Sequence, residues 1–257
     1  MPKIVIIADN ENEVSRLLQI SAKYKVPVTF RAAGTSLSGQ SVSDSVLIVA
    51  GKNWDDFSIS ADGTRIVLQP KLCCGTIWES KGMPDIAEKK VRELEKALWK
   101  ASEGGRYPVV CDQSPCLHRM KQHITGVNLY ESAEFVWKFL KDRLEFTQSV
   151  DPIALHLTCS TKLMKIDGYV RDLAALCSWS VLVPEGVGCC GFAGDKGMTH
   201  PELNRYALRK LAGQIRENGV ETGYSNSRTC EIGLQTNSGI PYRSIIYLVN
   251  ICTSPKV

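Results

Sequence analysis

The stretch GVGCCGFAGDKGM (residues 186–198) places two cysteines side by side, followed by a glycine and, after a short loop, by Lys-Gly-Met. A similar stretch, KLCCGTIWESKGM, occupies residues 71–83. Adjacent cysteines are poorly placed to bridge each other, because their Cα atoms lie about 3.8 Å apart, below the usual disulfide range. The paired cysteines therefore indicate metal ligands or redox groups.

The similarity between the two halves continues beyond these stretches. Cys73 matches Cys189 at an offset of 116 residues, and Cys116 matches Cys230 at an offset of 114. Between these anchors each half has an amphipathic segment that opens with proline and an acidic residue and closes on glycine, which is typical of a helix. A short apolar strand and a cysteine-bearing turn follow in each half. The chain therefore contains a duplicated module of about 115 residues.

The alternation of strands and helices predicts an α/β fold for the two modules, at about 72–145 and 150–257. The first module lacks a recognisable opening portion and is predicted to be truncated. The predicted helices cover residues 84–105, 131–143, 166–177 and 201–219, and the predicted strands cover residues 107–111, 127–130, 153–158, 180–183 and 220–224.

Four cysteines of the second module are predicted to converge from three loops: Cys159, Cys189, Cys190 and Cys230. Thiolates are soft donors that suit iron–sulfur clusters or zinc. The first module offers a second set, Cys73, Cys74, Cys111 and Cys116. Cys177 and Cys252 lie in apolar segments and are expected to be small buried side chains. His156, three residues before Cys159, is the histidine best placed to be a ligand, although an ordinary packing role is also open.

Composition narrows the classes of partner and compartment. The chain has 257 residues, 44% hydrophobic and 23% charged, and a net charge of +4 without basic runs, so we expect no nucleic-acid partner. No stretch approaches the roughly 20 apolar residues of a membrane span. Ten cysteines without a secretory signal favour a reducing compartment, and we expect the protein to be cytoplasmic.

Residues 72–257 resemble the tandem cysteine-rich ("CCG") domain that occurs in heterodisulfide reductase, in the iron–sulfur component of glycolate oxidase and in large FAD-linked D-lactate dehydrogenases. The family pattern is a lone cysteine, then Cys-Cys-Gly, then Cys-x-x-Cys. The second module matches the lone cysteine, the pair and Cys230, but its other late position is filled by Ser225, Asn226 or Ser227. The resemblance implies an iron–sulfur cluster on these cysteines.

A second resemblance lies in residues 1–70. The segment VPVTFRAAGTSLSGQSVSDSVLI (26–48) resembles the pyrophosphate loop of FAD-binding domains of the vanillyl-alcohol-oxidase type, within a β-α-β unit. Small residues in the loop expose backbone N–H groups that can surround a diphosphate. The resemblance implies FAD contacts from Arg31, Ala33, Gly34, Thr35, Ser36, Leu37, Ser38, Gly39 and Gln40.

The two resemblances correspond to the two ends of one enzyme type, whose middle is absent at LQPKLCCG (68–75). They imply an internally shortened, FAD- and iron–sulfur-dependent oxidoreductase of the D-lactate or D-2-hydroxyacid dehydrogenase type. Its implied partners are a small 2-hydroxyacid and an electron acceptor. We expect weak flavin binding, since one loop supplies only part of a cofactor site. The alternatives are an electron-transfer module that acts through iron–sulfur or thiol chemistry without its own flavin, and a structural zinc protein.

Overall fold

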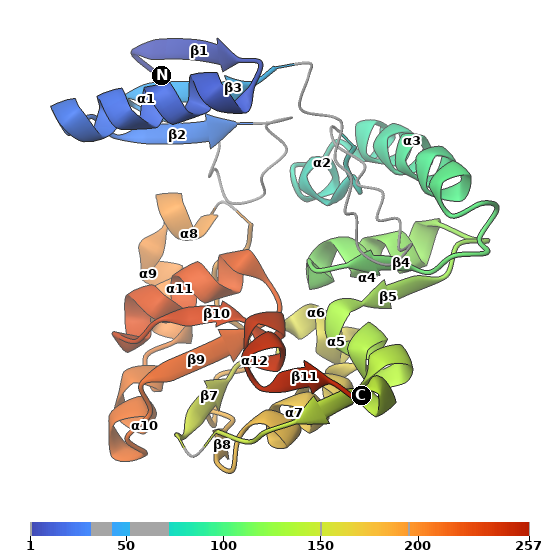
Figure 1. The fold of residues 1–257 in the computed structure, drawn as a ribbon, viewed down its shortest axis with the longest axis vertical. Coiled ribbons are helices and arrows are strands. Elements are labelled where there is room, and N and C mark those ends of the chain that lie inside the picture. The colour runs from blue at the N-terminus through green and yellow to red at the C-terminus, as the bar shows by residue number, and fades with distance from the viewer. Residues whose placement is uncertain (1, 32–42, 52–71, 150, 195, 257) are drawn as a thin grey trace.

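The structure is a computed structural model that describes residues 2–31, 43–51, 72–149, 151–194 and 196–256. It confirms the predicted α/β class: parallel strands alternate with helices in each part of the chain (Figure 1). The boundary predicted near residue 70 and the loop residues Ala33–Gln40 lie outside the described residues.

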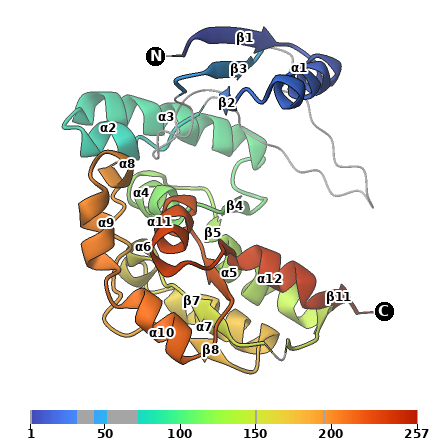
Figure 2. The same ribbon diagram turned by 90° about the vertical axis from the view of Figure 1, so that its left-hand side faces the viewer.

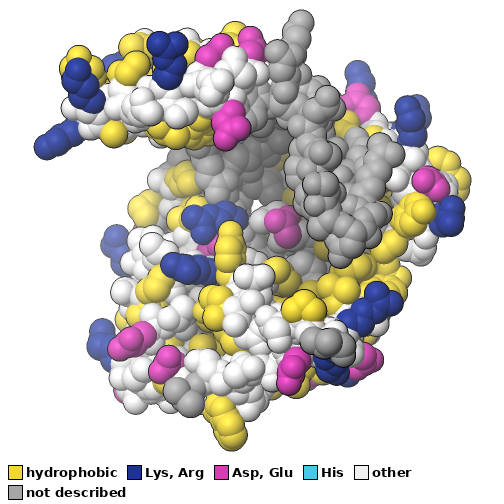
Figure 3. Space-filling model, in the orientation of Figure 1, with side chains coloured by type: hydrophobic (Ala, Val, Ile, Leu, Met, Phe, Trp, Pro, Cys, Tyr) yellow, Lys and Arg dark blue, Asp and Glu magenta, His cyan; other side chains and the backbone are white. Residues whose placement is uncertain are grey.

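The N-terminal unit is a three-stranded parallel sheet with one helix. Its elements are β1 (Ile4–Ala8), α1 (Glu11–Tyr24), β2 (Val28–Arg31) and β3 (Val46–Ala50), in the sheet order β1-β3-β2. Asn10 caps α1 by accepting a hydrogen bond from the Glu13 backbone N–H at 3.0 Å. Leu47 and Ile48 of the central strand are buried, whereas several apolar side chains of the outer strands are exposed (Figure 3).

The first cysteine module begins with two helices and a small parallel sheet. Its elements are α2 (Thr76–Ser80), α3 (Pro84–Ala101), β4 (Val109–Cys111), α4 (Ser114–His123) and β5 (Leu129–Glu131). Val91, Leu94 and Leu98 of α3 recur at helical spacing and pack on Leu117 and Met120 of α4. The predicted helix at 84–105 is therefore present, although it ends at Ala101.

The second module is built on a four-stranded parallel sheet in the order β10-β9-β7-β8. Its elements are β7 (Ile153–Leu155), α6 (Cys159–Leu163), α7 (Asp167–Cys177), β8 (Val181–Leu182), α8 (Lys196–Thr199), α9 (Pro201–Ala207), α10 (Leu211–Glu217), β9 (Thr222–Ser225), α11 (Arg228–Ser238), β10 (Tyr242–Ser244) and α12 (Ile245–Ile251). The duplication is visible in the structure: β4 and β5 pair in parallel in the first module as β9 and β10 do in the second.

Two predicted helices differ from the observed ones. The helix predicted over 201–219 is divided into α9 and α10 by a tight turn, in which Leu211 N–H donates to the Leu208 carbonyl at 2.9 Å. The turn lets Leu208 and Leu211 both point into the core.

The helix predicted over 131–143 consists of α5 (Ser132–Phe135), a π-helical segment (Val136–Leu140) and a 3₁₀ turn (Lys141–Arg143). The strand predicted over 153–158 ends at Leu155.

Packing crosses the predicted border between the modules. Ala133 and Val136 belong to the core formed by α7 and α12 of the second module, and α12 lies beside α5 (Figure 2). β6 (Leu144–Phe146) pairs with β11 (Thr253–Pro255) near the C-terminus in an antiparallel ladder. In the other direction, Ile166 packs into the core of the first module. The two cysteine modules therefore form one intertwined body.

Candidate functional site

The structure brings together the four cysteines predicted for the second module. Cys189 and Cys190 lie in the loop between β8 and α8, Cys159 begins α6, and Cys230 lies in the first turn of α11. The Cys189 thiol is hydrogen-bonded to the thiols of both Cys159 and Cys190. The Cys190 sulfur in turn lies 3.0 Å from the Cys230 sulfur. This contact series links residues that are up to 71 positions apart in the chain.

The glycine after each cysteine pair is required by the local backbone. Gly191 has a φ of +70°, and a Cβ there would lie 2.7 Å from the Ala207 side chain. Gly75 has a φ of +89°, and a Cβ there would lie 2.5 Å from the Ala87 carbonyl oxygen. Glycine adopts this left-handed conformation without the steric cost of a side chain. Each pair can therefore turn tightly against the helix beneath it.

Both glycines also donate hydrogen bonds to sulfur. The Gly191 N–H donates to Cys189 Sγ at 3.3 Å, and the Gly75 N–H donates to Cys73 Sγ at 3.4 Å. Cys116 and Cys230 each occupy the third position of a helix, α4 and α11. Helix N-termini and backbone N–H groups favour negative charge nearby. The two modules thus present their thiols in closely similar surroundings, which suit anionic sulfur ligands.

The thiols in each set shift one another's pKa in opposite directions. Hydrogen bonds from the Cys159 and Cys190 thiols lower the pKa of Cys189. The Cys189 sulfur in turn raises the pKa values of Cys159 and Cys190. The physical reason is that the first thiolate is stabilised by neighbouring S–H donors, whereas further deprotonation places like charges together. A metal centre would remove this penalty by neutralising the thiolates.

Three thiols of the first set follow the same pattern, and the fourth, Cys111, interacts with Cys74 through charge alone. Hydrogen bonds from the Cys116 and Cys73 thiols lower the pKa of Cys74. Cys111, the last residue of β4, interacts electrostatically with Cys74, and burial raises the pKa of its own thiol to about 12. The predicted residues Cys73, Cys74, Cys111 and Cys116 are therefore neighbours in space, although the first module was expected to be incomplete.

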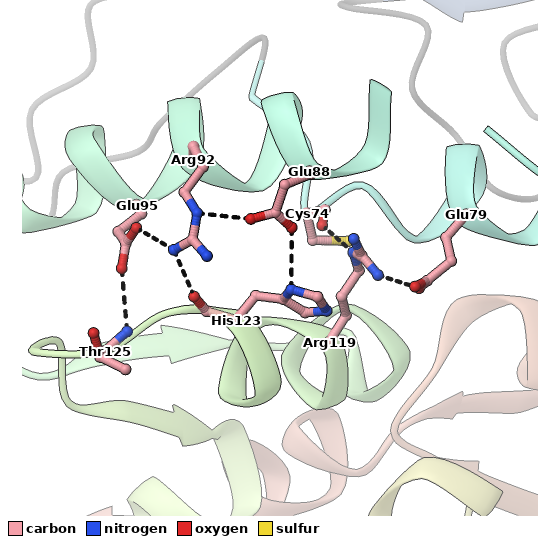
Figure 4. Close-up of polar contacts among 8 residues, drawn as sticks. All are labelled: Cys74, Glu79, Glu88, Arg92, Glu95, Arg119, His123 and Thr125. Atoms are coloured by element: carbon pink, nitrogen blue, oxygen red, sulfur yellow. Dashed lines mark hydrogen bonds and ion pairs between the residues drawn. The ribbon is translucent and has the colours of Figure 1, made fainter. Parts of the chain in front are cut away.

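Different side chains fix the two cysteine pairs. The buried Arg119 of α4 donates from Nε to the Cys74 carbonyl at 2.8 Å and pairs with Glu79 of α2 (Figure 4). In the second module the neutral Asn204 of α9 donates to the Cys190 carbonyl. The sequence did not indicate either residue, because each acts on a backbone carbonyl that leaves no pattern in the chain.

A second group of contacts in Figure 4 joins α3 to α4 in the first module. Arg92 on α3 donates to Glu88 at 2.8 Å, to Glu95 at 2.7 Å and to the His123 carbonyl at 2.9 Å. His123 Nδ1 lies 3.3 Å from Glu88, and the Thr125 N–H donates to Glu95 at 3.2 Å. These contacts hold the C-terminal end of α4 against α3.

Cys111 and Ser225 occupy equivalent places in the two modules. Cys111 is the last residue of β4 and lies five positions before Cys116, and Ser225 is the last residue of β9 and lies five positions before Cys230. Of the three residues that could fill the missing late position, Ser225 is thus the structural counterpart of a thiol. The repeat offset of 114 residues between Cys116 and Cys230 already contained this information.

His156 is held by Ser225 in the interior. Its Nδ1 lies 3.3 Å from Ser225 Oγ, and Ser225 Oγ donates to the His156 carbonyl at 3.3 Å. The side chain is only 2% exposed, and its Nε2 has no hydrogen-bond partner among the described residues. Burial and the nearby Lys162 charge lower the pKa of His156 to about 4. The negative charge of a Cys189 thiolate opposes this lowering of the His156 pKa only in part, so the imidazole is neutral near pH 7.

A buried acidic side chain, Glu131, links the two modules. Glu131 ends β5 and caps α5 by accepting from the Ala133 N–H at 2.6 Å. Its other oxygen accepts from Asn226 Nδ2 at 3.4 Å. Burial raises the pKa of Glu131. Sequence patterns did not predict this contact, because it joins residues 95 positions apart.

The thiol sets suit an iron–sulfur centre in donor chemistry, because each offers four soft sulfur ligands from loops and helix starts. Within the described ranges, no group of three or more His, Cys, Asp or Glu side chains is arranged to hold a single metal ion as it stands. Of the predicted FAD contacts, only Arg31 is described, at the end of β2. Residues Ala33 to Gln40 lie outside the described residues.

Comparison with protein families gives two matches. Residues 2–78 match a family described as "FAD binding domain", and residues 153–235 match a family described as "Cysteine-rich domain". The first match extends past Pro70 and includes Cys73 and Cys74. Together, the matches support an oxidoreductase of the kind that uses FAD, and the cysteine-rich domain is compatible with an iron–sulfur cluster. No curated protein matches the chain significantly.

Two solved structures align along nearly the whole chain. An aspartate racemase homologue from Pyrococcus horikoshii OT3 is 14% identical, with coverage of 98% of this chain and 99% of that chain and a TM-score of 0.29. Allantoin racemase from Pseudomonas fluorescens is 12% identical, with coverage of 98% and 88% and a TM-score of 0.27. Such low scores support no conclusion about fold or function. None of the helices in the described ranges is long and apolar enough to span a membrane.

Proposed function

We propose that the chain is an FAD- and iron–sulfur-dependent oxidoreductase of the D-2-hydroxyacid dehydrogenase type, in an internally shortened form. The observation that carries the proposal is the pair of equivalent four-thiol sets, each with a glycine turn at its centre. The match of residues 2–78 to the FAD-binding-domain family supports the flavin part of the proposal. The proposed partners are a small 2-hydroxyacid and an electron acceptor, and the proposed division of the chain is 1–70 and 71–257.

The residues that would hold an iron–sulfur centre are the eight cysteines of the two sets: Cys159, Cys189, Cys190 and Cys230, with Cys73, Cys74, Cys111 and Cys116. When bound, such a centre accepts and donates single electrons. The protein's own contribution is to orient and stabilise thiolate sulfur. Gly75 and Gly191 donate to the first sulfur of each pair, and Arg119 and Asn204 fix the carbonyl of the second cysteine.

Arg31 and residues 33–40 would contact the FAD diphosphate. The described part of the N-terminal unit leaves Val5 and Ile7 of β1 exposed, so the unit by itself encloses little of a flavin. Because ligand sites normally bury most of their ligand, we expect FAD to bind weakly and to be lost on desalting. Tight, stoichiometric FAD in the purified protein would contradict that expectation and would strengthen the proposed dehydrogenase activity.

The test of the proposal is anaerobic purification, followed by measurement of iron, acid-labile sulfide, zinc and flavin per chain. We expect iron and sulfide, and we expect Cys190→Ser to lose most of the iron of the second set and to melt at a lower temperature, because metal binding is coupled to folding. Cys252→Ser is the matched control, since Cys252 lies in the separate core formed with α7. Zinc without sulfide, or unchanged iron in Cys190→Ser, would contradict the proposal.

A further inference from the structure

The second module has a serine, Ser225, where the first module has the thiol of Cys111, and the structure places a histidine beside that serine. Ser225 stands at the end of β9, as Cys111 stands at the end of β4. A serine hydroxyl is a poor replacement for a thiolate as a soft ligand. The Ser225 hydroxyl is instead hydrogen-bonded to His156, at the end of the neighbouring strand β7.

The hydrogen bonds assign the tautomer of His156. The Ser225 hydroxyl has one hydrogen, which it donates to the His156 carbonyl at 3.3 Å. Its oxygen must therefore accept from Nδ1–H, 3.3 Å away. Nε2 then carries the free lone pair. In metal sites a ligating imidazole commonly donates its other N–H to an oxygen in the same way, which fixes the ring and the tautomer.

The free lone pair of His156 is buried without a partner in the part of the chain that the structure describes. The residue is 2% exposed, and Nε2 finds no donor there. A buried polar atom without a hydrogen bond costs free energy unless something else occupies it. His156 follows β7 directly and lies three residues before Cys159, the cysteine that begins α6.

We propose that His156 Nε2 is a metal ligand of the second module, which adds a nitrogen donor to the four thiols of Cys159, Cys189, Cys190 and Cys230. Ser225 is its positioning residue. The first module would hold its centre through sulfur alone, and the second through mixed sulfur and nitrogen ligation. Replacement of cysteine by histidine raises the reduction potential of iron–sulfur centres in known cases, so the two centres would differ in potential. The inference rests on the proposed iron–sulfur function.

Isotope labelling tests the ligand directly. The full chain is reconstituted anaerobically with iron and sulfide, with either natural or ¹⁵N-labelled histidine, and is reduced for pulsed EPR. We expect a histidine nitrogen coupling that changes with the isotope, disappears in His156→Gln and persists in His200→Gln, an exposed control on the surface. A fully loaded wild-type protein without a histidine coupling, or a coupling that survives in His156→Gln, would overturn the proposal.

A rescue variant provides an independent readout. We expect His156→Gln to bind less iron than the wild type, and His156→Gln with Ser225→Cys to regain it, because the added thiol stands where Cys111 stands in the first module. Wild-type iron content in His156→Gln would contradict the proposal. Cys190→Ser separates the histidine proposal from the iron–sulfur function on which it rests. If Cys190→Ser keeps its iron, the iron–sulfur function itself is wrong. If Cys190→Ser loses iron and the His156 experiments are negative, only the histidine ligand is wrong. Should His156→Gln not fold, the labelled wild type still decides.

Discussion

Arg119 of α4 donates a hydrogen bond from Nε to the backbone carbonyl of Cys74, 2.8 Å away and 45 positions earlier in the chain. The guanidinium is 4% exposed and is paired with Glu79. At the corresponding place in the second module α11 has Gly233, where a Cβ would lie 2.5 Å from Asn204 Nδ2, and Asn204 holds the Cys190 carbonyl. The two modules therefore fix equivalent carbonyls with a cation in one case and a neutral amide in the other.

Arg119→Met is expected to lower the free energy of unfolding by about 1–3 kcal/mol, because the buried carbonyl of Cys74 loses its donor. Urea unfolding followed by circular dichroism measures the change. Arg106→Met is the matched control: Arg106 is a solvent-exposed arginine paired with Glu103, and its loss should change stability by no more than about 0.5 kcal/mol. Equal effects of the two substitutions would show that the Cys74 contact adds nothing to stability.

Gly191→Ala is expected to destabilise the second module by more than about 1 kcal/mol, since alanine disfavours the left-handed backbone and its Cβ would meet Ala207. Displacement of the loop should also reduce iron binding. Gly168→Ala in α7 is the control, because none of the described atoms lies within 4 Å of the added Cβ. Thermal melts and iron content measure both effects, and a fully stable, iron-replete Gly191→Ala would refute the steric argument.

The burial of Glu131 predicts a pH dependence. Its folded-state pKa is raised above the unfolded value, so the folded protein binds more protons in the interval between the two. The contribution of Glu131 to the free energy of unfolding is therefore full below the ordinary carboxyl pKa and is lost as pH rises through the raised pKa. In reduced, metal-free protein, the stability of the wild type relative to Glu131→Gln should fall with increasing pH. A difference independent of pH would contradict this.

The outer strand of the N-terminal unit is predicted to promote self-association. Ile7 on β1 is 66% exposed, whereas Ile48 on the adjacent central strand is 1% exposed. An exposed apolar strand at a sheet edge invites pairing with another chain. Sedimentation velocity should show less association for Ile7→Lys, with the fold retained. Ile48→Lys should instead unfold the unit, because it buries an unpaired charge. Unchanged association in Ile7→Lys would exclude this strand as the contact.

Local periodicity predicted most elements correctly but not their interruptions. The helix α3 and the strands β4 and β9 lie close to where apolar spacing and terminal signals placed them. The division between α9 and α10 was not predicted, because it depends on where Leu208 and Leu211 must point in a core formed by distant segments. The packing of α5 into the second module was also not predicted, since a repeat in sequence does not specify which core each helix joins.

The sequence by itself determined the α/β class, the duplication and the identity of the eight candidate cysteines, because glycine turns, helix signals and cysteine spacing are local features of the chain. Only the tertiary structure decided that Arg119 and Asn204 hold the cysteine pairs, that Ser225 stands in place of a thiol, and that His156 has a buried nitrogen without a partner among the described residues. These relationships join residues that lie up to 69 positions apart. They depend on burial and on hydrogen bonds between strand ends and helices that become neighbours only in the folded protein. A local sequence pattern therefore does not reveal them.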